Sequence, residues 1–225
     1  LSRAVAWREV GLAVVVLWSV LGGACFFLGA QSIYDRWGTS LNATLVLDVV
    51  FLIGCLAVIG FVFWRQRRQG EGIVELGWGR PVRMPVIVIA VVYGLAWTAM
   101  SYMRGGDPLA FPWQRPIMMA IGLVLAFAEE IAVRGLILDR LARCGTSRII
   151  QIVVTAGIMA VYHGVVGHSV WPSYIVSSFV LFGVLSVIYV YGGRSLTPVY
   201  IAHAMAHFLG DPALMQGVLY GVGAG

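Results

Sequence analysis

A small set of side chains combines the residue types and spacing that acid–base chemistry requires. Glu129 and Glu130 are adjacent within the apolar segment IMMAIGLVLAFAEEIAVRGLILDR, and Arg134 follows four residues after Glu130. The four histidines of the protein all lie in its last third: His163, His168, His203 and His207. A carboxylate in an apolar site binds protons more readily and acts as a general base, with a histidine sharing or relaying the proton.

Helix geometry gives the two glutamates different roles. An acidic side chain at the centre of a membrane helix costs about 2.5 to 3.5 kcal/mol on insertion scales, so two adjacent acids need compensation. Residues four apart share a helix face, so Glu130 and Arg134 are expected to form an ion pair. Glu129 is rotated by roughly 100° from Glu130. We therefore interpret Glu130 and Arg134 as a structural pair and Glu129 as the residue left for chemistry.

The depth of these residues in their segments predicts that they meet. At about 1.5 Å per residue, Glu129 lies roughly 16 Å from one end of its segment and His163 lies roughly 22 Å along the next. His203 and His207 lie roughly 12 to 18 Å along a later segment and share one helix face. A simple hydrogen bond to His203 is an alternative role for His207. His168 lies near a predicted membrane boundary, and we interpret it as a loop residue.

The segments that carry these residues are long and apolar. Sixty percent of the 225 residues are apolar and 11% are charged, and the mean hydropathy is +0.90. Crossing about 30 Å of hydrocarbon takes about 20 apolar residues. The apolar runs cover residues 10–30, 41–64, 84–103, 116–138, 149–166, 173–191, 196–209 and, as a short last run, 212–222. We predict an all-α, polytopic helical bundle of seven or eight transmembrane helices forming one domain over residues 1–225, with the first run kept as an anchor rather than cleaved as a signal peptide.

The charges predict the orientation of this bundle. On alternate connections the arginines gather on one side of the predicted membrane, which the positive-inside rule makes the cytoplasmic side, together with the N-terminus. These are Arg3, Arg8, Arg65, Arg67, Arg68, Arg80, Arg83, Arg140, Arg143, Arg148 and Arg194. The sequence pI near 9.4 then reflects topology and contact with anionic lipid headgroups, not nucleic-acid binding. All fifteen basic residues are arginine, which favours a prokaryotic source and hence the plasma membrane.

The cysteines indicate no redox or thiolate chemistry. Cys25, Cys55 and Cys144 are odd in number and lack a CxxC spacing, so we expect neither a disulfide framework nor a thiolate metal site.

The spacing of the polar residues resembles that of a known family. E129-E130-x-x-x-R134 in one segment, a histidine that ends a later segment, and H203-x-x-x-H207 in the next are similar to the motifs of the CPBP family of intramembrane proteases. This family includes the CAAX prenyl endoproteases and the bacteriocin-processing, or Abi, proteins. The resemblance covers residues 116–211, which we expect to be the catalytic core.

The resemblance implies roles for individual residues. Glu129 and His163 would activate a water molecule for attack on a peptide carbonyl, while His203 and His207 would stabilise the oxyanion. Two positions depart from the family pattern. Met159 stands where the family commonly has Phe, and His207 stands where it commonly has Asn.

The histidine at position 207 leaves a second chemistry open. Glu129, His163, His203 and His207 are a set of residue types that can bind zinc, whereas the absence of an HExxH motif favours metal-free, glutamate-type catalysis.

We therefore expect an intramembrane endopeptidase whose substrate is a peptide or membrane protein, such as a leader peptide or a small regulatory protein. A different class of function is also compatible with the sequence: a non-catalytic scaffold or chaperone that uses a protease-like core to bind a partner membrane protein. A proton-coupled transporter is a third reading, but the sequence has no visible inverted repeat.

Overall fold

The computed structural model describes residues 3–38, 40–103, 109, 111–166 and 171–210. Regular structure within these ranges is entirely helical, so the all-α prediction is confirmed for them. The helices are α1 (Arg3–Leu17), η1 (Trp18–Ala30), α2 (Gln31–Trp37), α3 (Leu41–Arg68), α4 (Met84–Met103), α5 (Arg115–Glu130), η2 (Ile131–Leu138), α6 (Asp139–Arg143), α7 (Arg148–Val166), α8 (Trp171–Tyr191) and α9 (Leu196–Leu209).

Two continuous helical rods, each made of three consecutive helices, change their winding along their length. α1, η1 and α2 follow one another without a break, and so do α5, η2 and α6, with η1 and η2 wound as π-helices. π-helical turns are rare in proteins, and those that occur often lie at functional sites. The second of these, η2, begins at the residue after Glu130, so the winding changes where the two acidic side chains lie.

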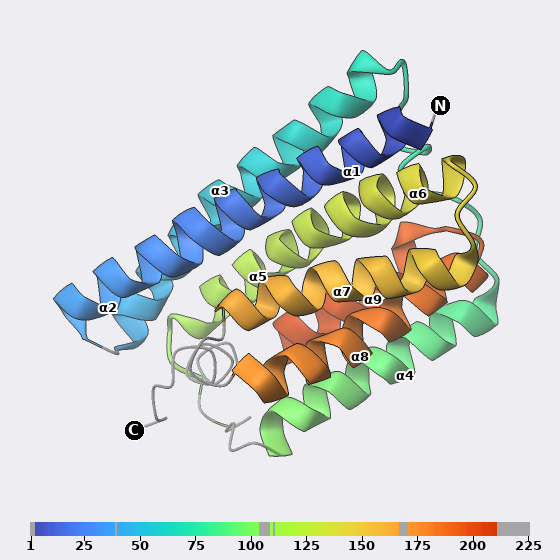
Figure 1. Ribbon diagram of the computed structural model, residues 1–225. Helices are drawn as coiled ribbons and strands as arrows, with labels where there is room; N and C mark the ends of the chain where they lie inside the picture. The colour runs from blue at the N-terminus through green and yellow to red at the C-terminus, as the bar shows by residue number, and fades with distance from the viewer. Residues whose placement is uncertain (1–2, 39, 104–108, 110, 167–170, 211–225) are drawn as a thin grey trace.

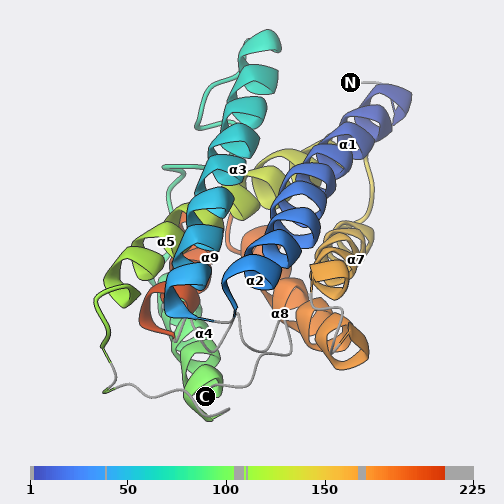
Figure 2. The ribbon, with the colours of Figure 1, turned by 90° about the vertical axis from the view of Figure 1, so that its left-hand side faces the viewer.

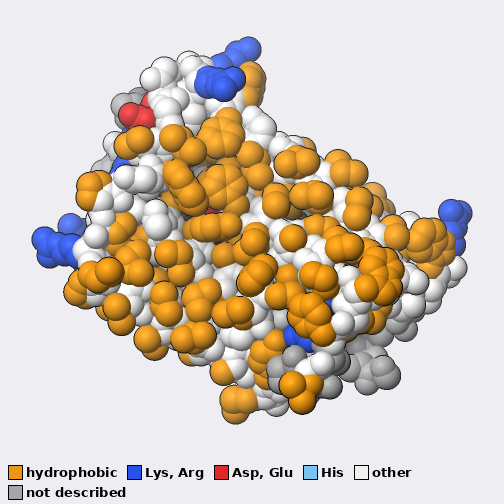
Figure 3. Space-filling view, turned by 180° about the vertical axis from the view of Figure 1, so that it is seen from behind, with side chains coloured by type: hydrophobic (Ala, Val, Ile, Leu, Met, Phe, Trp, Pro, Cys, Tyr) orange, Lys and Arg blue, Asp and Glu red, His pale blue; other side chains and the backbone are white. Residues whose placement is uncertain are grey.

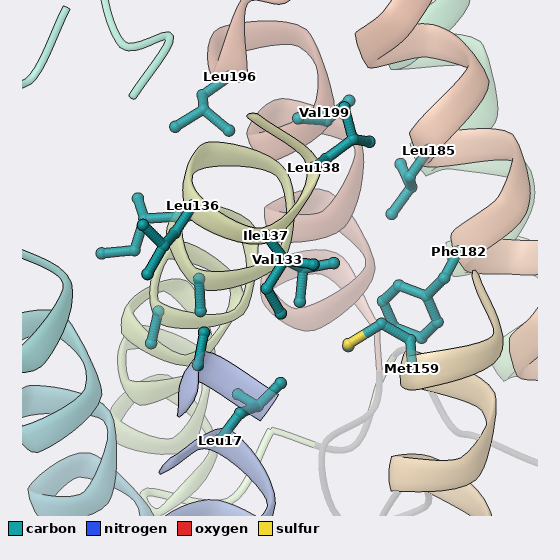
Figure 4. Packing of buried hydrophobic residues seen from close by; sticks show 14 of the residues in the cluster. Leu17, Val133, Leu136, Ile137, Leu138, Met159, Phe182, Leu185, Leu196 and Val199 are labelled. Atoms are coloured by element: carbon teal, nitrogen blue, oxygen red, sulfur yellow. The ribbon is translucent and has the colours of Figure 1, made fainter. Parts of the chain in front are cut away.

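The rod made of α5, η2 and α6 lies in the middle of the molecule. α1 and α3 pack on one side of it, and α7, α8 and α9 lie on the other, with α4 beyond α9 (Figures 1 and 2). All eight residues of η2 are buried. Figure 4 shows their apolar side chains against those of the surrounding helices, with Phe182 and Met159 together at one side. This central rod therefore places Glu129 and Glu130 deep inside the bundle.

α4 and α9 approach each other closely because a glycine faces the contact. A Cβ atom added at Gly94 of α4 would lie 2.9 Å from the carbonyl oxygen of Ala202 in α9, which is too close for a side chain. This close approach brings Trp97, one turn further along α4, against His203 of α9.

The surface of the bundle suits a lipid environment. Four helices are long and apolar enough to cross a membrane: Arg3–Ala24, Leu41–Arg68, Met84–Met103 and Arg115–Arg143. Two shorter apolar helices, Arg148–Gly164 and Ile175–Tyr191, accompany them. Hydrophobic side chains cover most of the face in Figure 3, and basic side chains lie mainly toward its margins. The chain is thus a polytopic helical membrane protein, whereas the count of seven or eight spans stays a prediction because α9 has 14 residues and the run 212–222 lies outside the described residues.

One end of the bundle carries a network of charged side chains. The guanidinium of Arg140, which is fully buried, lies 2.9 Å from the carboxylate of Glu71 and 3.1 Å from that of Asp139. Arg143 contacts both acids as well. Glu71 belongs to the connection between α3 and α4, so these ion pairs tie that connection to the end of the central rod.

The same connection is anchored on its other side to α9. Leu76 is fully buried, and the backbone N–H of Leu196 donates to the carbonyl oxygen of Gly77 at 2.9 Å. Gly77 has a φ of 100° and sits so close to the carbonyl of Arg194 that a Cβ atom would lie 2.6 Å from it. The arginine-rich connections predicted to share one membrane face therefore meet at one end of the molecule.

The described cysteines are consistent with a packing role. Cys55 and Cys144 are buried free thiols, and the side chain of Cys25 lies outside the described residues.

Candidate active site

Three charged side chains at the junction of α5 and η2 are withdrawn from the surface. Glu129 is 2% exposed, and Glu130 and Arg134 are fully buried. Their burial requires partners, because an isolated charge in an apolar interior is very costly. Arg134 Nη1 lies 2.9 Å from Glu130 Oε1, and Arg134 Nη2 donates to the carbonyl oxygen of Phe182 in α8 at 2.8 Å. Glu130 and Arg134 thus form a buried ion pair that also ties η2 to α8.

Glu130 has a second partner that the sequence did not reveal. Its Oε1 atom lies 2.8 Å from Nδ1 of His203 in α9. Glu129 is further from the same ring, with 3.8 Å between its Oε2 and His203 Nε2. In the described part of the chain, Oε2 of Glu129 is buried and has no hydrogen-bond partner. His203 therefore lies between the two glutamates, bonded to Glu130 and facing Glu129.

The imidazole of His203 is held between aromatic rings. Trp97 stacks on it with 5.4 Å between ring centroids and an interplanar angle of 9°. Phe182 meets it edge-on at 5.4 Å. His203 itself is 1% exposed, so its ring has little freedom to rotate away from Glu130.

His207 lies one turn after His203 and contacts it. The two Nε2 atoms are 3.2 Å apart. The position of His207 depends on a glycine in α5, because a Cβ atom at Gly122 would lie 2.8 Å from Cβ of His207. The structure thus places both histidines of the HAMAH segment on the face of α9 that meets α5.

His163 reaches the same region from α7. Its Nδ1–H donates to the carbonyl oxygen of Met159, one turn earlier, at 2.8 Å. Its ring lies 4.6 Å from that of Phe182, which makes Phe182 a common neighbour of His163 and His203. The side chain of the adjacent Tyr162 lies near the carboxylate of Glu129. α7 therefore approaches Glu129 through Tyr162, and the ring of His163 lies against that of Tyr162.

The residues that the sequence singled out are thus brought together, with one exception. Glu129, Glu130 and Arg134 lie at the junction of α5 and η2, and His203 of α9 lies close to both glutamates and to His207. His163 of α7 joins them through Phe182 of α8. His168 lies outside the described residues. Trp97, Tyr162 and Phe182 also border this cluster, and the sequence did not single them out. A tryptophan within a span, rather than at its interfacial end, was the signal available for Trp97.

The zinc alternative requires its ligand side chains to be grouped around one point. Within the described ranges, no three His, Cys, Asp or Glu side chains are grouped so that they could hold a metal ion. The zinc set predicted from residue types was Glu129, His163, His203 and His207.

An apolar cleft adjoins the site. It has a volume of about 580 Å³ and lies between η1 and α7, lined by Trp18, Gly22, Leu28 and Tyr162 among others. Tyr162 is common to both, because it lies near Glu129 and also borders the cleft. A ligand in the cleft would thus lie one side chain away from the carboxylates.

Comparison with known proteins identifies the segment that carries the site. Residues 111–209 match the family model described as type II CAAX prenyl endopeptidase, Rce1-like. No curated protein and no solved structure matches the chain. The matched segment contains all six clustered polar residues, whereas Trp97 and the η1 wall of the cleft come from the part of the chain before it.

Proposed function

Because residues 111–209 belong to the Rce1-like CAAX prenyl endopeptidase family of intramembrane proteases, we propose that this protein is an endopeptidase that hydrolyses a peptide bond of a membrane-associated substrate. The protein itself would reside in the plasma membrane of a prokaryote, with its N-terminus in the cytoplasm. A prokaryotic source favours a leader peptide or a small membrane protein over a prenylated substrate.

One observation carries this proposal most directly: the environment of Glu129. Its carboxylate is 2% exposed, and its Oε2 atom has no hydrogen-bond partner in the described part of the protein. Leaving a buried carboxylate oxygen unbonded is costly, and Glu129, unlike Glu130, has no arginine in an ion pair with it among the described residues, which favours a functional role over a structural one. We propose that Glu129, assisted by His163, takes a proton from the attacking water.

The two histidines of α9 supply the complementary part of the reaction. Attack on the peptide carbonyl places a negative charge on its oxygen, and fixed hydrogen-bond donors in a water-poor site stabilise that charge strongly. We propose that His203 and His207 lie next to this oxyanion. Their fixed positions support this role, because stacking holds His203 and the contact with Gly122 holds His207.

The substrate would reach these residues from the cleft beside Tyr162. The walls of the cleft are largely apolar and include Trp18 and Leu28, which suits the side chains of a membrane-associated peptide. A metal-free, glutamate-type reaction also predicts that activity survives treatment with strong chelators, because no step of this mechanism requires a bound metal.

The experiment that tests this function compares membrane peptides in cells that carry the wild-type protein or its Glu129→Gln variant. The amide keeps the shape of the side chain but cannot accept a proton as the carboxylate does. We expect one or more cleavage products to disappear in Glu129→Gln. They should persist in Asp139→Asn, a matched loss of a negative charge further along the same rod.

Two results would contradict the proposal. Undiminished cleavage by Glu129→Gln would remove the role of Glu129. If that variant instead keeps the cellular phenotype and co-purifies with a stable membrane partner, the protein acts as a scaffold or chaperone.

A further inference from the structure

The carboxylate of Glu130 has a contact that an ion pair with Arg134 does not require. Its Oε1 accepts a hydrogen bond from Arg134 at 2.9 Å and also lies 2.8 Å from Nδ1 of His203. A guanidinium is always protonated in proteins, and a carboxylate paired with it is ionised. An ionised carboxylate only accepts hydrogen bonds, so Nδ1 of His203 must carry the proton.

This assignment determines what the other ring nitrogen can do. A neutral imidazole carries one proton, so Nε2 of His203 then has a lone pair and no hydrogen. That lone pair faces Nε2 of His207 at 3.2 Å and Oε2 of Glu129 at 3.8 Å. In its neutral form His203 cannot donate to an oxyanion from Nε2. It can do so only after Nε2 has received a proton.

We propose that Glu130 is a positioning residue that holds His203 as the Nδ1–H tautomer, so that Nε2 of His203 carries the proton from Glu129 to the leaving amine. This inference rests on the hydrolase function proposed above. It gives Glu130 a role beyond the ion pair with Arg134, and it makes His203 a proton carrier as well as an oxyanion neighbour.

One proton passes from the attacking water to the leaving amine through Glu129 and His203. Glu129 takes a proton from water while the water oxygen bonds to the carbonyl carbon. The O–H bond of Glu129 then breaks, the proton bonds to Nε2 of His203, and the electron pair stays on the carboxylate. When the C–N bond breaks, the amine nitrogen takes that proton together with the bonding electron pair, and His203 returns to its neutral form. A contraction of the 3.8 Å separation or one bridging water completes the path between the two residues.

The surroundings of His203 favour its transient positive charge. Glu130 is bonded to one edge of the ring, Glu129 faces the other, and the indole of Trp97 lies flat against it. The face of an indole ring attracts cations. Once the proton has passed to His203, the carboxylates of Glu129 and Glu130 are balanced by Arg134 and His203, so these four side chains carry no net charge while the oxyanion is present.

The test is to read the tautomer of His203 directly by nitrogen NMR on the full-length protein labelled with ¹⁵N-histidine. The chain has only four histidines, and the His203 ring is assigned by the loss of its signals in a His203→Asn variant. We expect Nδ1 of His203 to carry the proton in the wild-type protein. A wild-type ring protonated at Nε2 and bare at Nδ1 would overturn the proposal without the use of any variant.

Kinetics on Glu130→Gln provide the second readout. The amide can still accept a bond from Arg134 but does not require a proton on Nδ1 of His203. We expect the Nδ1–H signature to weaken and kcat to fall by at least about tenfold, with KM within about twofold of wild type. Asp139→Asn, the matched control, should leave both the signature and kcat unchanged. A Glu130→Gln variant that folds and keeps wild-type kcat would contradict the inference.

The role of Glu130 and the hydrolase activity are tested by different measurements. The tautomer is observed without substrate, so it is informative even if the protein is not a protease. Loss of the hydrolase proposal would appear instead as normal cleavage by Glu129→Gln.

Discussion

We expect a single methyl group at Gly122 to disable the site while leaving the protein folded. An added Cβ would lie 2.8 Å from Cβ of His207, whereas carbon atoms in contact lie about 3.5 to 4.0 Å apart. Gly122→Ala must therefore push His207 away by about 1 Å. The distance of 3.2 Å between Nε2 of His207 and Nε2 of His203 then lengthens beyond hydrogen-bond range. A misplacement of about 1 Å can reduce an enzymatic rate by about 100-fold.

The stability of this variant should change much less than its activity. Overpacking a core costs about 1 to 3 kcal/mol, and replacing Gly by Ala inside a helix returns about 1 kcal/mol. The net loss is then about 0 to 2 kcal/mol, which an unfolding titration in detergent can measure. The matched control is Gly183→Ala in α8, where the added Cβ would meet Cβ of Ala156 at an ordinary 3.7 Å. Wild-type kcat in a folded Gly122→Ala protein would refute the reasoning.

Three further predictions follow from other contacts. Replacing Arg134 by Met should destabilise the protein by about 3 to 5 kcal/mol in a detergent unfolding titration, because the Glu130 carboxylate stays buried without its cation. Adding Glu130→Leu to this variant should recover part of the lost stability. Gly22→Leu should fill the apolar cleft and raise KM for substrate with little change in kcat, whereas Gly11→Leu, where the added Cβ has no neighbour within 4 Å, should leave KM unchanged. Equal KM values for the two variants would show that substrate does not use the cleft. Burial alone raises the pKa of Glu71, but hydrogen bonds and charges from its two arginine partners lower it overall below the ordinary value of 4.5. The stabilisation from this group is thus present above that value and lost as the pH falls through the lowered folded pKa, so thermal unfolding of Glu71→Gln should depend less on acid pH than that of the wild type.

The sequence predicted most of the helices because the apolar runs leave few alternatives in a membrane. It also placed Glu130 and Arg134 on a common face, and their spacing of four residues suffices for an ion pair even though the π-helix η2 begins between them. Periodicity alone did not indicate this change of winding. Apart from Arg134, the residues of η2 would be apolar and buried in an α-helix as well, so the π-helical turn is apparent only from the backbone.

The partner of His203 was not predictable from the sequence. Depth estimates place residues along a membrane normal, but they do not set the rotation of one helix against another. That rotation depends on close contacts such as Gly94 against Ala202 and Gly122 against His207, which a single sequence does not reveal. As a result, the sequence-based reading associated His203 with Glu129, whereas its hydrogen bond goes to Glu130.

The aromatic residues around His203 could not be predicted from the sequence for a related reason. Trp97 and Phe182 lie in apolar helices, where aromatic residues at helical spacing usually pack in the core. Only their contacts with the imidazole of His203 distinguish them from other packing residues. Trp97 also precedes the matched segment 111–209, so the family resemblance did not point to it.

The most direct test of the central claim is a single-turnover cleavage in H₂¹⁸O, with an excess of protein over an identified substrate and mass analysis of the product. If Glu129 activates water for direct attack, the new carboxyl group carries one ¹⁸O atom in the first turnover, and Glu129→Gln yields no product. An unlabelled first product together with ¹⁸O in the Glu129 carboxyl would show that this carboxylate attacks the substrate itself. That result, or normal cleavage by Glu129→Gln, would contradict the account.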